Sequence, residues 1–191
     1  MAMALCVPAS AQRVSDGHRF LEAVRERDGT VATEMLNEPG STVVNSRDIS
    51  NGETALHVAA ARRDTAWLRF LTQRGADPNI SNKRGVTPLQ VSVSLGDVDG
   101  AEALLKAGAS QSHGNATGET PLITAVHRRD MPMIRVLLEN GANIEMTDSS
   151  GRSARDYALL QGERSPIVEA LDRAEEERAK KPAAQDYGPR L

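Results

Sequence analysis

Apolar side chains recur at intervals of three and four residues along the chain, in stretches that polar turns separate. This spacing places them on one face of a helix, so each stretch predicts an amphipathic helix with a buried apolar face. Trp67 is expected at the edge of the first such stripe, partly packed into the core. The stripes consist of Leu68, Phe70 and Leu71, then Ala101, Leu104 and Leu105, then Met133, Ile134, Leu137 and Leu138.

Residues that start and end helices flank these stripes. Hydroxyl side chains that can cap a first helix stand at Thr54, Thr87, Thr120 and Ser153, and Pro88 and Pro121 follow two of them. Acidic side chains that favour the start of a second helix stand at Asp64, Asp97, Asp130 and Glu163. The second helices are expected to end at Gly75, Gly108 and Gly141. Each unit therefore reads as a first helix, a short turn, a second helix and a projecting turn.

The same hexapeptide pattern returns every 33 residues, with its glycine at positions 52, 85, 118 and 151. It reads Gly52-Glu53-Thr54-Ala55-Leu56-His57, Gly85-Val86-Thr87-Pro88-Leu89-Gln90, Gly118-Glu119-Thr120-Pro121-Leu122-Ile123 and Gly151-Arg152-Ser153-Ala154-Arg155-Asp156. This period and motif resemble the ankyrin-repeat family over nearly the whole chain. The resemblance implies an all-α ankyrin-repeat solenoid of about five stacked helix-turn-helix repeats with projecting turns.

The repeat register divides the chain into segments. Residues 12–47 are expected to form an N-terminal capping repeat, with helices over 18–28 and 30–37. Residues 48–180 are expected to form four ankyrin repeats, and the last of them is a C-terminal cap. In that cap Arg155 replaces the repeat's leucine, as suits a face exposed to water. Residues 181–191, which contain Pro182, Gly188 and Pro189, are expected to form a disordered tail.

Residues 1–11 are interpreted as the remnant of a signal peptide. A short apolar stretch precedes Pro8, and Ala9-Ser10-Ala11 fits the small-residue pattern of a cleavage site. No basic residue precedes the apolar stretch, which leaves an ordinary cytosolic N-terminus as the alternative. The interpretation predicts a bacterial protein in the periplasm or secreted, similar to periplasmic ankyrin-repeat proteins; the alternative location is the cytoplasm.

Composition and charge argue against several other classes of protein. The net charge of -3 does not suit nucleic-acid binding, which needs a basic surface. The single cysteine leaves no intramolecular disulfide, and the histidines lie in different repeats without ligand spacing. No apolar run reaches the ~20 residues that a membrane-spanning helix needs. We therefore expect no enzyme activity, no cofactor, no metal site and no membrane insertion.

The resemblance implies binding of another protein through the concave groove and the tips of the turns, by a chain that is expected to be a monomer. Basic residues gather at Arg62-Arg63, Lys83-Arg84 and His127-Arg128-Arg129, which suggests an acidic partner surface. The alternative is that these cations only complement helix dipoles. A secreted effector or a cytosolic scaffold using the same groove is the alternative function. The candidate partner-binding residues are Glu53, Arg62, Lys83, Arg84, Val86, Leu95, Glu119, His127, Arg128 and Arg152.

Overall fold

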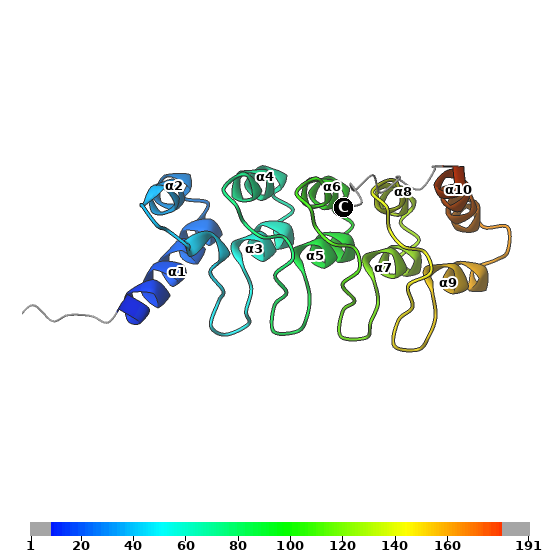
Figure 1. Cartoon of the computed structure of the whole chain (residues 1–191), viewed down its shortest axis with the longest axis horizontal. Coiled ribbons are helices and arrows are strands. Elements are labelled where there is room, and N and C mark those ends of the chain that lie inside the picture. The colour runs from blue at the N-terminus through cyan, green and yellow to red at the C-terminus, as the bar shows by residue number, and fades with distance from the viewer. Residues whose placement is uncertain (1–8, 181–191) are drawn as a thin grey trace, which may run out of the picture.

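Helix pairs stack side by side in two layers in the computed structural model, which describes residues 9–180, with side chains from Asp16 onward (Figure 1). One layer contains α1 (Ala9–Glu26), α3 (Ala55–Ala61), α5 (Pro88–Leu95), α7 (Pro121–His127) and α9 (Ala154–Leu160). The other contains α2 (Gly29–Asn37), α4 (Thr65–Gln73), α6 (Val98–Lys106), α8 (Met131–Glu139) and α10 (Pro166–Lys180). A short 3-10 helix, Val43–Asn45, joins the first two pairs. The described residues form no β-strand, and the prediction of an all-α solenoid is confirmed.

The helices begin at the predicted caps, with one exception. Thr87 accepts a hydrogen bond from the backbone of Gln90, and Asp130 accepts one from the backbone of Met133. The prediction that a second helix starts at Glu163 is wrong. That helix, α10, begins at Pro166, and the Ser165 hydroxyl accepts from the backbone N–H of Val168 at 3.3 Å. The start is shifted because the turn after α9 is longer than the turn after α7.

The first helix is longer than the sequence pattern indicated. We expected it over residues 18–28, but α1 starts at Ala9 and ends at Glu26, where Asp28 caps α2. Asp28 accepts hydrogen bonds from Thr30 and Val31, so it belongs to the start of the next helix. The predicted signal remnant, residues 1–11, lies mostly outside the described residues. The predicted disordered tail, residues 181–191, lies entirely outside them.

The core runs the length of the solenoid between the two layers. The predicted apolar stripes supply it, and Phe70, Leu105 and Leu138 are only partly buried at its margin. Side chains with an exposed fraction of 1% or less include Leu56, Leu68, Leu71, Leu89, Leu104, Leu122, Met133, Ile134 and Leu137. Because these side chains belong to one core cluster and successive helix pairs pack on each other, every repeat depends on the next for burial.

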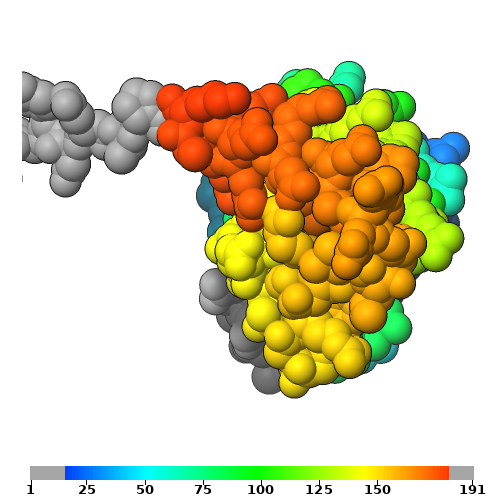
Figure 2. Space-filling view, turned by 90° about the vertical axis from the view of Figure 1, so that its right-hand side faces the viewer, coloured from blue at the N-terminus to red at the C-terminus, as the bar shows by residue number. Residues whose placement is uncertain are grey.

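The C-terminal repeat covers the end of the stack (Figure 2). Arg155 occupies the position that leucine holds in the three preceding repeats. It donates to Asp172 and Glu175 of α10, at 2.6 Å each. No further repeat of the described solenoid would cover a leucine at this position. The ion pairs of Arg155 therefore suit the end of the solenoid. Leu159 and Leu160 remain exposed beside them, by 42% and 73%.

Candidate protein-binding groove

A groove of about 670 Å³ runs across the first helices and the projecting turns of three consecutive repeats. Its floor is made of small and aliphatic side chains, among them Ala61, Val86, Val91 and Leu95. Polar side chains form its walls: Glu53, His57, Arg84, Gln90, Ser94, Asn115, Thr117, Glu119 and Thr124. An apolar floor with polar walls is the arrangement that a partner's side chains and backbone can both use.

Asparagine side chains fix the shape of the turns that form the groove walls. Asn82 accepts hydrogen bonds from the backbone N–H groups of Arg84 and Val86, at 2.9 and 3.1 Å. Asn115 accepts from Thr117 and Glu119, at 2.9 and 3.0 Å. Neighbouring tips are also joined, since the backbone N–H of Lys83 donates to the carbonyl of Asn51 at 2.9 Å. The groove walls are therefore held in place before any partner binds.

A buried histidine ties the first groove repeat to the second. The His57 Nδ1 accepts from the Thr54 backbone at 3.1 Å, so Nε2 carries the proton and donates to the carbonyl of Val86 at 2.9 Å. Burial lowers the pKa of His57 below its ordinary value of 6.5. The ring is thus a neutral structural bridge between the two repeats.

Glutamine makes the same kind of bridge one repeat further along. The Gln90 Oε1 accepts from the Thr87 backbone at 2.8 Å, and its Nε2 donates to the carbonyl of His113 at 2.9 Å. In the third repeat Ile123 occupies this position and is fully buried, so the polar bridge is replaced by apolar packing. His57 and Gln90 thus line the groove and also join its repeats.

Beyond Glu119 the groove continues into a polar network that spans the last two repeats. The Glu119 carboxylate accepts from Asn115 at 3.1 Å and lies 3.2 Å from His127 Nδ1. The His127 ring meets Tyr157 edge to face, with centroids 4.1 Å apart. The Tyr157 hydroxyl donates to Asp148 at 2.6 Å, and this bond holds the pKa of that carboxyl well below its usual range. The last two repeats therefore share one connected surface.

Five of the ten predicted partner-binding residues lie together along the groove. They are Glu53, Arg84, Val86, Leu95 and Glu119. His127 and Arg152 lie next to it, and both contact Tyr157: the Arg152 guanidinium stands 5.9 Å above the ring. The structure thus brings seven predicted residues onto one continuous surface. Whether a partner touches them stays a prediction.

The other three predicted residues have structural neighbours instead. Arg62 donates to the carbonyls of Val24 and Arg25 at the end of α1. The Lys83 Nζ donates to the carbonyl of Ile49, which links two turns. Arg128 lies against Gly96 of the preceding repeat. Arg63 is used in the same way and donates to the carbonyl of Leu95 at 2.6 Å. Within the basic clusters, Arg62, Arg63 and Lys83 therefore join repeats through backbone carbonyls, whereas Arg84 lines the groove.

Several residues of this surface were not among the sequence candidates. Val91, Ser94 and Thr124 face the groove from α5 and α7, and Tyr157 joins from α9. Their positions follow from the helical period, because Val91, Thr124 and Tyr157 are the same position of successive repeats, 33 residues apart. The sequence candidates came from the turns and from the C-terminal ends of the first helices, whereas the groove also uses side chains from within α5 and α7.

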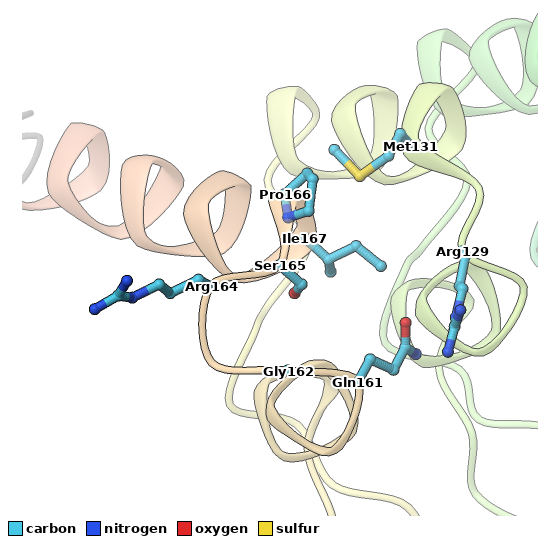
Figure 3. Close-up of a pocket in the computed structure, with 8 residues that line it drawn as sticks. All are labelled: Arg129, Met131, Gln161, Gly162, Arg164, Ser165, Pro166 and Ile167. Atoms are coloured by element: carbon cyan, nitrogen blue, oxygen red, sulfur yellow. The ribbon is translucent and has the colours of Figure 1, made fainter.

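A second hollow, of about 570 Å³, lies between the starts of α8 and α10 (Figure 3). Met131, Pro166 and Ile167 supply its apolar wall. Arg129 turns toward Gln161, while Arg164 points away from the hollow, so the two arginines do not converge on one point (Figure 3). The donor of the Gln161 amide is already used, since its nitrogen donates to the carbonyl of Val126 at 3.0 Å. This arrangement does not define an anion site.

No group of three or more His, Cys, Asp or Glu side chains within residues 9–180 could hold a metal ion. None of the described helices is long and apolar enough to cross a membrane.

The stacked helix pairs, the 33-residue register and the projecting turns define a helical repeat solenoid. Family models describe the same register: ankyrin repeats (3 copies) match residues 20–115, and ankyrin repeats (many copies) match residues 104–158. The chain belongs to the ankyrin-repeat family, whose members generally mediate protein–protein interaction. It is 42% identical over 64 residues to human oxysterol-binding protein-related protein 1. That match covers 34% of this chain and spans 7% of the length of the human protein.

Proposed function

We propose that the groove between Glu53 and Glu119, together with the surface around Tyr157, binds a partner protein. The observation that carries this proposal is the groove's composition: an apolar floor lies between polar walls that the asparagine-shaped turns hold rigid. A preformed surface loses little conformational freedom on binding, which favours affinity. The function is therefore that of an interaction module, without catalysis of its own.

The charges of the groove, rather than the basic clusters, indicate the charge of the partner segment. Arg62 and Lys83 are engaged by backbone carbonyls, so the expectation of an acidic partner loses its main support. The walls contain both a carboxylate, Glu53, and a guanidinium, Arg84, and neither side chain makes a hydrogen bond or ion pair with another described side chain. We propose a partner segment of mixed charge with aliphatic side chains that reach the floor.

We further propose that the protein acts as a monomer in the bacterial periplasm. The apolar stretch before Pro8 and the small residues Ala9-Ser10-Ala11 support export, and cleavage would leave Gln12 as the first residue. A secreted effector or a cytosolic scaffold with the same groove is the alternative. The N-terminal peptide of the protein recovered from cells distinguishes them, because an intact Met1 is incompatible with cleavage after Ala11.

Blocking the groove tests the proposed function. Ala61 and Ser94 are exposed on its surface, so the double variant A61R/S94R places two bulky cations there without disturbing the core. We expect affinity capture from separated periplasmic and cytosolic fractions to recover a partner with the native protein and to lose it with this variant. The matched control is Gln73→Arg, which adds a cation on the exposed end of α4 in the other layer. Equal recovery by all three proteins would refute the groove as the binding site.

A further inference from the structure

The layer of α2, α4, α6, α8 and α10, here called the outer layer, has its first two helices held apart. Within this layer α4 packs closely on α6, α6 on α8 and α8 on α10, whereas α2 packs much less closely on α4. Figure 1 shows the wider space between α2 and α4. The layer of α1, α3, α5, α7 and α9, here called the inner layer, has no such interruption, because α1 packs on α3. The capping repeat is therefore opened on its outer side only.

Side-chain size at two repeat positions explains the opening. On α6, Gly100 faces α4, since a Cβ added there would lie 3.2 Å from Leu68 Cδ1, and the small residue Ala103 follows three residues later. On α4, the same two positions, 33 residues earlier, hold Trp67 and Phe70. Small residues allow two helices to approach closely, whereas the two aromatic rings keep α2 at a distance.

A cleft of about 260 Å³ fills the space between the helices. Gly29 and Ala66 line it together with the rings of Trp67 and Phe70, which meet edge to face with centroids 5.4 Å apart. The rings are only partly buried. Aromatic rings that remain partly open to solvent at a cleft are typical of interaction sites.

Arginines brace both ends of this cleft. Where the two helices begin, Arg27 Nε lies 3.2 Å from Asp64 Oδ2. Where they end, Arg74 donates to Asn37 Oδ1 at 3.0 Å and lies 5.1 Å above the Phe70 ring. These bridges join α2 to α4 across the opening. The cleft is thus a preformed feature of the fold.

The size and charge of the cleft indicate its occupant. Its volume is below the ~300–1,000 Å³ of sites for drug-sized molecules, so it suits one bulky side chain. The charge of Arg27 is balanced by Asp64, whereas the described contacts of Arg74 are to an amide and an aromatic ring. An acidic group beside the anchor would therefore find an uncompensated cation at Arg74.

We propose that this cleft is a second protein-binding site, which takes a bulky apolar anchor residue flanked by an acidic residue from a partner protein. It lies in the outer layer, away from the turn-lined groove, so both surfaces can be occupied together. The site is independent of the proposed groove function, because none of its lining residues belongs to the groove.

Tryptophan fluorescence tests the site directly, because Trp67 is the single tryptophan in the chain. The probe is the peptide acetyl-Gly-Asp-Phe-Asp-Gly-amide, added to the full-length protein. We expect a saturable change in Trp67 emission, and binding about tenfold weaker for a matched peptide with lysine in place of aspartate. Emission that does not change with peptide, or changes equally with both peptides, would overturn the proposal.

Two variants locate the binding. Gly29→Leu should fill the cleft, and an added Cβ at Gly29 meets no atom within 4 Å, so the fold has room for it. We expect it to weaken peptide binding about tenfold, and Arg74→Gln to weaken it about fivefold. Urea denaturation of both variants checks that they fold normally. Undiminished binding by a folded Gly29→Leu protein would place the peptide elsewhere and exclude the cleft.

Discussion

At the scale of single residues, the bridge formed by His57 shows how one side chain serves two repeats. Its Nδ1 satisfies a buried backbone donor of its own helix, and its Nε2 satisfies a carbonyl in the next repeat. Leaving either group unpaired in the interior costs about 1–3 kcal/mol. We therefore expect His57→Ala to lower the free energy of unfolding by about that amount, as measured by urea denaturation.

Glutamine provides the matched control for this substitution. Gln90 makes the equivalent pair of hydrogen bonds one repeat later, so His57→Gln should retain most of the stability that His57→Ala loses. If both variants were equally destabilised, the loss would come from packing of the ring, and the bridge would contribute nothing measurable.

The same ring predicts a pH dependence of stability. Because burial lowers the pKa of His57 in the folded state below 6.5, the unfolded chain binds more protons when the pH falls below that value. Its contribution to stability is thus complete above pH 6.5 and is lost as the pH falls toward the folded-state pKa. We expect the stability difference between the native protein and His57→Gln to shrink over this range. A difference independent of pH would show that His57 does not titrate differently on folding.

At the scale of helices, the core of the stack depends on leucines that contact a neighbouring repeat. Leu104 of α6 is completely buried, and truncation to alanine would leave a cavity between helix pairs. We expect Leu104→Ala to cost about 2–5 kcal/mol in chemical denaturation. A cost near zero would contradict its place in the core.

Arg128, a predicted partner-binding residue, can be compared with Leu104 in its effect on the free energy of unfolding. It is exposed at the end of α7, and no hydrogen bond or ion pair of its side chain is found in the described structure. We expect Arg128→Ala to change the free energy of unfolding by less than about 0.5 kcal/mol in the same urea titration. A loss comparable to that of Leu104→Ala would assign Arg128 a structural role.

The sequence predicted the helices well where the repeat pattern was complete. Thr87, Asp130 and their equivalents fixed the helix starts, because capping is a local interaction that needs only neighbouring residues. The pattern was misleading at Glu163, where a longer turn moves the start of α10 to Pro166. It also could not show that Trp67 separates α2 from α4, since helix spacing depends on side chains from two repeats at once.

At the scale of the whole molecule, the groove was only partly predictable. Glu53, Val86 and Leu95 were found by their place in the repeat, because the solenoid puts equivalent positions on one surface. Arg62 and Lys83 were also chosen by their place in the repeat, but both reach backbone carbonyls of another repeat. Sequence spacing predicts where the backbone places a flexible side chain. It does not predict which hydrogen-bond acceptor that side chain reaches.

Because α2 packs loosely on α4, the capping repeat is joined to the rest of the stack mainly through α1. Arg62 makes one of the contacts to α1. It donates from α3's end to the last carbonyls of α1, the Val24 carbonyl among them. Loss of such bonds costs about 1–2 kcal/mol, a factor of about 5–30 in an opening equilibrium. We therefore expect Arg62→Ala to speed amide hydrogen exchange by that factor in α1 and α2, with little effect in α7 to α10. Since a solenoid is stabilised by neighbour contacts, the capping repeat can open while the rest of the stack stays folded. Equally faster exchange in every helix would instead mean that the stack opens as one unit, despite the gap beside Trp67.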